Sequence, residues 1–168
     1  MNSSQLVIGS ERRGRAGRVA VTEAPPAALG PPDYADAFQV GRRATDGRSA
    51  ESWARAGFDG LPTAARRAAL FIHRRIFGFD LGEWDSPDHV FGWRIVSSEP
   101  ELLHLEAHSR LMSGRMLWRL EADTLTMTTF VRYGMRRAAP TIWAVLGNVH
   151  RGGAPGLLTL AARASEAG

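Results

Sequence analysis

Apolar and polar residues alternate with a period of two across the second half of the chain, a spacing typical of strands in a half-buried sheet. Four successive segments carry this pattern, at residues 89–100, 101–110, 113–123 and 124–134. The joints between them are short, so the strands are expected to pair as an antiparallel meander. One face of this sheet collects mainly apolar side chains and the other collects Arg, His, Glu and Thr, which predicts a dry face and a wet face.

The first half of the chain predicts one more strand and two helices. Residues 33–43 alternate and are expected to form the strand. A short helix is predicted over residues 49–58, with Ser49 as its N-cap. Residues 61–78 carry an apolar stripe at helical spacing with arginines on the opposite, solvated side. His73 is expected at the boundary of that stripe.

The C-terminal segment, residues 139–164, is apolar at helical spacing and predicts a long helix. Gly152, Gly153 and Pro155 are expected to kink or break it before its last turns. The order is then strand, two helices, antiparallel meander and long C-terminal helix, which is an α+β arrangement. The last helix and the helix over residues 61–78 are both available to cover the dry face.

The chain length of 168 residues favours one domain. Ser, Gly and Arg dominate residues 1–18, which are expected to form a flexible arm, followed by a short strand near residues 18–24. Residues 25–32, PPAALGPP, predict an extended and exposed connector. Residues 1–32 are therefore interpreted as arm and connector, and residues 33–168 as the folded domain.

Composition excludes several kinds of chemistry. The chain has no cysteine, so disulfides and thiolate metal sites are ruled out and a reducing cytoplasm is expected. All 21 basic residues are arginine, and without lysine there is no Schiff base and no Walker A loop. The net charge of +4 is spread without a basic stripe, so no nucleic-acid partner is expected. No apolar run approaches the ~18 residues of a membrane span, and the N-terminus lacks the layout of a secretory signal.

Three segments together resemble a bacterial family of unknown function: DYADAF at residues 33–38, LMSGRMLWRLEADTLTMTTFVRYG at 111–134 and IWAVLGNVHR at 142–151. That family belongs to the START-like, polyketide-cyclase-like (SRPBCC) superfamily, and the resemblance covers residues 33–163. It implies a helix-grip fold, in which a curved antiparallel sheet packs on a long C-terminal helix, with two shorter helices after the first strand.

The same resemblance implies a function. A cavity between sheet and helix binds a small hydrophobic molecule, and some members catalyse cyclisation or dehydration there. Members fused to a nicotinamide-nucleotide-binding domain suggest a link to a nicotinamide-dependent enzyme. No GxGxxG motif is present in this chain, and no cofactor is expected.

Candidate ligand-binding residues lie on the dry face and on the last helix. Aromatic and methionine side chains with a few polar groups are typical of a ligand pocket, although the same residues also build ordinary cores. The candidates are Trp93, Met116, Trp118, Met127, Thr129 and Trp143.

Tyr133 and His150 are the candidate catalytic residues. A tyrosine hydroxyl can polarise a ligand carbonyl, and a histidine at a pocket mouth can act as a general base. The alternative for His150 is a structural role near the end of its helix, where the helix dipole stabilises a cation.

His104, Glu106 and His108 share one face of a predicted strand. Their side chains lie ~7 Å apart along it, and His-x-His with a carboxylate can bind zinc. Arginines on the same face oppose a divalent cation, however, and suit pairing with Glu106. A solvated sheet face is therefore the expected outcome, and no metal site is predicted.

Three hypotheses remain open from the sequence. The first is a binding module for a hydrophobic ligand, the second is an enzyme of the cyclase or dehydratase kind, and the third is an interaction domain with a fully packed interior. A connected cavity separates the first two from the third.

Overall fold

The computed structural model describes residues 14–43, 45–84 and 86–166 of the chain, which form an α+β fold. Seven antiparallel strands make one open curved sheet in the order β1-β2-β7-β6-β5-β4-β3. The strands are β1 Gly17–Val19, β2 Tyr34–Gly41, β3 His89–Val90, β4 Trp93–Ser98, β5 Leu102–His108, β6 Met112–Leu120 and β7 Thr124–Tyr133. The helices are the 3₁₀ turn η1 Ala27–Leu29, α2 Ala50–Asp59, α3 Thr63–Phe71, the π-helix η2 Ile72–Ile76 and α4 Ala138–Glu166.

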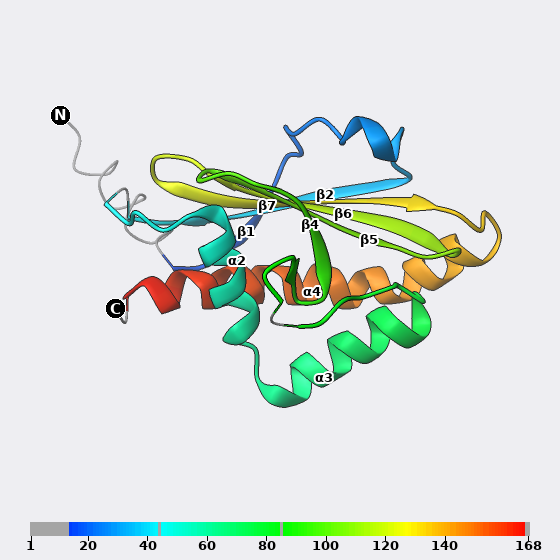
Figure 1. The fold of residues 1–168 in the computed structure, drawn as a ribbon. Coiled ribbons are helices and arrows are strands. Elements are labelled where there is room, and N and C mark those ends of the chain that lie inside the picture. Colours follow the sequence, from blue (N-terminus) through cyan, green and yellow to red (C-terminus); the bar gives the residue numbers. More distant parts are fainter. Residues whose placement is uncertain (1–13, 44, 85, 167–168) are drawn as a thin grey trace.

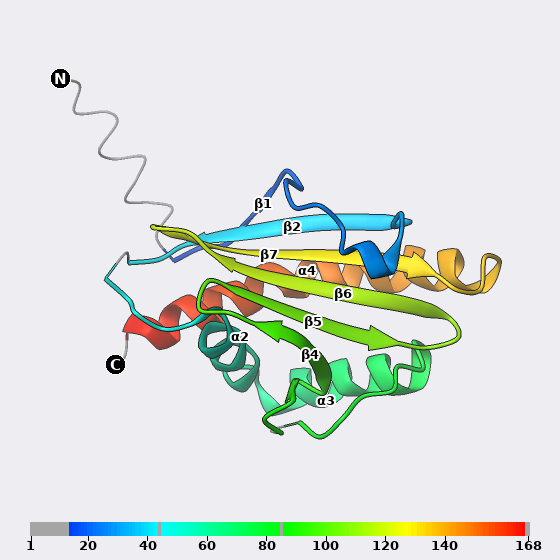
Figure 2. The same ribbon diagram turned by 45° about the horizontal axis from the view of Figure 1, so that its top comes forward.

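The helices α2, α3 and α4 all lie on one side of the sheet, and the segment containing η1 crosses the other side (Figure 1). Figure 2 shows α4 running along β2 and β7, with α2 beside it and α3 further out. The predicted antiparallel meander and the long C-terminal helix that packs on it are confirmed. None of the helices in the described parts of the chain is long and apolar enough to cross a membrane.

The segment predicted as one strand over residues 89–100 is two strands. β3 and β4 fold back on each other with His89 opposite Arg94 and Val90 opposite Trp93. The turn between them is Phe91–Gly92, with φ angles of 55° and 78°. A two-residue turn with both φ angles positive fits the twist of a hairpin, and glycine adopts it without strain. Phenylalanine is rare in that conformation, which is why the pattern of residues did not indicate the turn.

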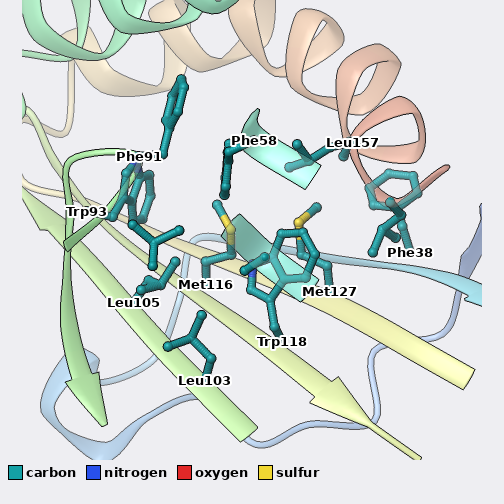
Figure 3. Packing of buried hydrophobic residues seen from close by; sticks show 14 of the residues in the cluster. Phe38, Phe58, Phe91, Trp93, Leu103, Leu105, Met116, Trp118, Met127 and Leu157 are labelled. Atoms are coloured by element: carbon teal, nitrogen blue, oxygen red, sulfur yellow. The ribbon is translucent and has the colours of Figure 1, made fainter. Parts of the chain in front are cut away.

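The apolar core covers the inner face of the sheet. Leu103, Leu105 and Trp118 are fully buried there. In Figure 3, Met116 and Met127 project from the same side of the sheet, toward Phe58 and Leu157 of the helices. Trp53 and Phe58 of α2 complete this core between the sheet and α4. The predicted dry face is therefore confirmed.

Close packing of α2 on α4 depends on Gly57. A Cβ atom at this position would lie 3.0 Å from the Leu157 carbonyl oxygen and 3.2 Å from the Ala161 Cβ. Only a residue without a side chain lets the two helices approach this closely. The N-cap predicted at Ser49 is confirmed, since its hydroxyl accepts a hydrogen bond from the Ser52 backbone N–H at 3.2 Å.

The predicted break in the C-terminal helix does not occur. α4 is continuous from Ala138 to Glu166, with Pro155 inside it. A proline in a helix interior costs about 3 kcal/mol, whereas burying one leucine side chain contributes about 1.5–3 kcal/mol. Leu157 and Leu158 are both buried immediately after Pro155. Packing against α2 and the sheet therefore outweighs the local propensity to end the helix.

Residues 14–32 lie along the sheet, and the predicted connector is exposed at Pro25, Ala27, Ala28 and Pro31 but contains the 3₁₀ turn η1 with the buried Leu29. β1 pairs with the edge of β2. Leu29 of η1 is 2% exposed and lies against Leu117 and Phe130 on the outer face. Two side-chain contacts tie this segment down: Arg132 donates to the Leu29 carbonyl oxygen at 2.6 Å, and Arg119 pairs with Glu23. The part of the predicted arm before residue 14 lies outside the described residues.

The outer face is thus only partly wet. Leu117 and Phe130 interrupt its polar pattern, and each is almost fully buried. Such side chains are stable on an outer face only if another segment excludes water from them. The η1 segment provides this cover through Leu29.

We expect Leu29→Ala to lower the free energy of unfolding by about 2–5 kcal/mol, because it removes a buried leucine side chain. Urea denaturation measures the loss. The matched control is Val21→Ala in the same segment, where the side chain is 38% exposed and the change should stay within about 0.5 kcal/mol. Equal stability of the two variants would show that η1 does not cover the outer face in solution.

Candidate functional site

A cavity of about 330 Å³ lies between the inner face of the sheet, α4 and the α3–η2 segment. Its lining is almost entirely aromatic, aliphatic and methionine side chains. Apart from the tryptophan N–H groups, the polar side chains among the lining residues are those of His73, Thr129 and His150. The cavity is therefore an apolar space with a few polar groups on its wall, the usual composition of a small-molecule site.

The α3 side of the cavity is partly exposed to solvent. None of the α3 side chains is buried. Ala65 and Ala68 of α3 line the cavity although both are exposed, and Val149 on α4 lines it with 57% of its surface exposed. The cavity therefore reaches the surface between α3 and α4.

Six of the eight residues singled out from the sequence line this cavity. They are Trp93, Met116, Met127, Thr129, Trp143 and His150. They come from β4, β6, β7 and α4, so the fold brings together side chains that are up to 57 positions apart (150 − 93).

Trp118 and Tyr133 lie outside the lining. Trp118 is fully buried beneath Phe58, with the ring centroids 6.0 Å apart, and serves the core. Tyr133 sits at the end of β7, where its backbone N–H donates to the Asp33 carboxylate at 2.7 Å. Burial, and then the nearby Asp33 charge, raise the pKa of the Tyr133 hydroxyl. The fold does not bring this hydroxyl to the cavity.

His73 enters the cavity wall through an irregular turn. Residues Ile72–Ile76 form a π-helix, closed by a hydrogen bond from the Phe77 N–H to the Ile72 carbonyl oxygen at 2.9 Å. π-helical turns occur often at functional sites. The His73 ring contacts four aromatic rings at centroid distances of 5.7–5.9 Å, those of Phe77, Phe79, Phe91 and Trp93.

Burial in this aromatic surround determines the charge of His73. The pKa of its imidazole falls to about 4, mainly because burial disfavours the charged form and secondly because of the His150 charge. His73 is therefore neutral at neutral pH. Its Nδ1 is buried and has no hydrogen-bonding partner.

Asp36 and His150 form a pair beside the cavity. Asp36 lies on the inner face of β2 with its side chain fully buried. Its Oδ1 is 3.2 Å from Nε2 of His150, and the Tyr34 hydroxyl donates to its Oδ2 at 2.5 Å. Arg151 reaches the Tyr34 hydroxyl at 3.4 Å. Burial, and then the hydrogen bond to Asp36, raise the pKa of Tyr34.

The sequence contained signals for both residues that its interpretation missed. Asp36 places a carboxylate between Tyr34 and Phe38 on the apolar side of a strand, where a charge needs a partner. His73 lies four positions after Ala69 and eight after Ala65, on the stripe that faces the cavity.

The outer-face group of histidines and Glu106 is an ion-pair cluster. Glu106 is 6% exposed and contacts Arg94, His108 at 3.2 Å and Arg115 at 2.8 Å. Burial, and then the charges of Arg115 and Arg94, lower the pKa values of His104 and His108. Within the described parts of the chain, no three His, Asp or Glu side chains are grouped so that they could hold a metal ion.

Comparison with models of known protein families, with curated proteins and with solved structures found no match to this chain. The cavity and its polar side chains are therefore the structural features that bear on function.

We expect His73 to make stability depend on pH. The unfolded chain takes up a proton near the ordinary pKa of 6.5, whereas folded His73 does so only at about 4. The free energy of unfolding should therefore fall as the pH drops through this window. In His73→Phe this contribution is absent, so urea denaturation from about pH 7 to about pH 4 should give a flatter dependence. Identical dependences in the two proteins would mean that His73 is not buried as described.

Proposed function

We propose that this chain is a START-like helix-grip domain that binds a small hydrophobic molecule in the cavity between its sheet and α4. The observation that carries the proposal is the apolar cavity itself. Its volume of about 330 Å³ falls within the range of small-molecule sites, roughly 300–1,000 Å³. A core that served stability alone would be expected to close such a space, since interiors pack to crystal-like density.

The lining favours a ligand with an apolar body and one polar end. Met116, Met127 and Phe79 present a soft apolar surface to the space. The polar side chains of His150 on α4 and Thr129 on β7 both lie next to Asp36: His150 contacts its carboxylate, and Thr129 is its cross-strand partner. A hydroxyl or carbonyl group at this end of the ligand would find hydrogen-bonding partners there.

Two other functions compete with this proposal. An interaction domain without a ligand is disfavoured, because it predicts an interior filled by side chains. A cyclase or dehydratase is favoured by one specific observation, the contact between Asp36 and His150 on the cavity wall. A functional link to a nicotinamide-dependent enzyme is suggested only by the family resemblance.

Native mass spectrometry of the purified full chain, followed by extraction and identification of any bound molecule, tests the proposal. A reproducible hydrophobic molecule at near-unit occupancy supports the binding function and supplies its chemical class. The proposal is contradicted if the protein carries no molecule and also fails to bind the apolar fluorescent probe N-phenyl-1-naphthylamine.

We expect Ala65→Trp to weaken binding of the apolar probe N-phenyl-1-naphthylamine by at least about tenfold, or about 1.4 kcal/mol. Ala65 lines the cavity but is exposed on α3, so an indole there can narrow the opening without disturbing the core. Fluorescence titration measures the affinity.

Ala64→Trp is the matched control, since the neighbouring Ala64 is equally exposed on α3 and does not line the cavity. It should bind the probe as the wild type does. If both tryptophan variants retain wild-type affinity, the probe does not bind in this cavity.

A further inference from the structure

In the described part of the chain two carboxylates are buried, on opposite faces of the sheet, and they have different partners. Glu106 on the outer face contacts two arginines, Arg94 and Arg115. Asp36 on the inner face forms its one side-chain ion pair among the described residues with His150. Arginine carries a permanent charge and is the usual partner of a buried carboxylate, whereas histidine gains and loses its proton near neutral pH. The inner pair therefore joins a buried carboxylate to a side chain of the kind that acts as a general base.

The geometry of the pair leaves one histidine nitrogen available. An ionised carboxylate only accepts hydrogen bonds, so the contact at 3.2 Å requires a proton on Nε2 of His150. Nδ1 then carries the free lone pair, because the contact of Nε2 with Asp36 is the one hydrogen bond that the His150 side chain forms among the described residues. The His150 side chain lines the cavity and is 20% exposed. This is the arrangement of a general base that is oriented by a carboxylate.

Asp36 is itself held in place. The Tyr34 hydroxyl donates to its second oxygen at 2.5 Å, and Tyr34 packs edge-on against Trp143 with ring centroids 5.0 Å apart. Trp143 in turn contacts the His150 ring at 5.7 Å. The carboxylate, the tyrosine and the tryptophan thus fix the imidazole, and the buried negative charge stabilises the imidazolium that forms when Nδ1 takes a proton.

Two neutral polar side chains, His73 of η2 and Thr129 of β7, line the same cavity and can bind an oxygen atom. His73 remains uncharged beside His150, so it can donate one hydrogen bond without repelling an imidazolium. The Thr129 hydroxyl is buried, has no partner, and lies opposite Asp36 in the β2–β7 pairing. Both residues contribute to the cavity lining.

We propose that the cavity catalyses proton transfer at a carbon next to the carbonyl group of a hydrophobic substrate, with His150 as the base and Asp36 as its positioning residue. The proposal rests on the binding function proposed above. His150 Nδ1 takes the proton, the C–H electron pair becomes the C=C bond of an enolate, and the carbonyl π pair moves to the oxygen. His150 then returns the proton to the same carbon or to a conjugated one, which restores the carbonyl and the neutral imidazole. No oxidant, reductant or second substrate is needed.

The test uses 2-tetralone, a compact hydrophobic ketone, in D₂O with the full chain. Proton NMR follows the replacement of its hydrogens next to the carbonyl by deuterium. We expect saturable exchange with the wild type and a loss of at least about 100-fold in His150→Gln, the range that a general base contributes. His104→Gln, a histidine of the outer face, should exchange the ketone as fast as the wild type does.

Asp36→Asn tests whether Asp36 orients His150 or has only a structural role. The variant also tests the proposal if His150→Gln fails to fold. It should lower the exchange rate at saturation while leaving the affinity for 2-tetralone unchanged. The ¹⁵N shifts of the His150 ring should also move away from those of the Nε2–H form, since the amide no longer selects that tautomer. Unchanged shifts together with an unchanged rate would refute the role of Asp36.

Binding and catalysis are read out independently. Displacement of N-phenyl-1-naphthylamine measures whether 2-tetralone occupies the cavity. If the ketone binds but exchanges equally fast with the wild type and with His150→Gln, the catalytic proposal is wrong and the binding function stands. If neither the probe nor the ketone binds, the binding function fails and the catalytic proposal fails with it.

Discussion

The curved sheet has an apolar inner face that must be shielded from water. A straight helix cannot contact this curved face across the whole width of the sheet. α4 packs along β2, β7 and α2, while α2 covers the neighbouring strands β5 and β6. Gly57 allows these two helices to meet closely, since a Cβ atom there would lie 3.0 Å from the Leu157 carbonyl oxygen. Beyond this contact, the remaining part of the inner face is bounded by α3, none of whose side chains is buried, and by η2, which contributes His73 to the cavity wall. The cavity is the space that this arrangement leaves.

The buried carboxylates on the two faces of the sheet have different kinds of partners. On the outer face Glu106 pairs with permanent cations, and Leu29 covers the neighbouring apolar side chains. This cluster joins strands β4, β5 and β6. On the inner face the carboxylate of Asp36 is paired with a histidine and a tyrosine next to an apolar space. The contacts of Asp36 are strong, because electrostatic interactions in a desolvated environment are stronger than in water.

Several polar atoms around the cavity have no hydrogen-bonding partner. Besides Thr129 and His73, the indole N–H groups of Trp93 and Trp143 are buried and unpaired. Buried donors without partners cost about 1–3 kcal/mol each. A bound molecule that accepts hydrogen bonds would recover part of this energy. The strained Phe91, whose φ is 55°, lies at the same cavity.

The sequence by itself determined the strands of the meander, the first long strand, three helices and the dry inner face of the sheet. Alternation at period two specified the strands of the meander, because side chains of a strand must point to opposite faces. Spacing near four specified the apolar stripe of the helix over residues 61–78, and Ser49 marked the start of α2. The same patterns identified Trp93, Met116, Met127, Thr129, Trp143 and His150 as side chains of one interior, and all of them line the cavity.

Only the tertiary structure decided the rest, because the deciding interactions join distant parts of the chain. Pro155 stays within α4 since packing of Leu157 and Leu158 outweighs its local cost. Leu29 is buried because Leu117 and Phe130, about 90 to 100 positions later, need cover on the outer face. Trp118 and Tyr133 lie on the expected face of the sheet, but neither lines the cavity. The alternation of residues along a strand predicts the face of a side chain and not its distance from a cavity. Asp36 and His150 are separated by 114 positions and meet because α4 crosses β2, and that meeting gives the cavity wall its chemistry.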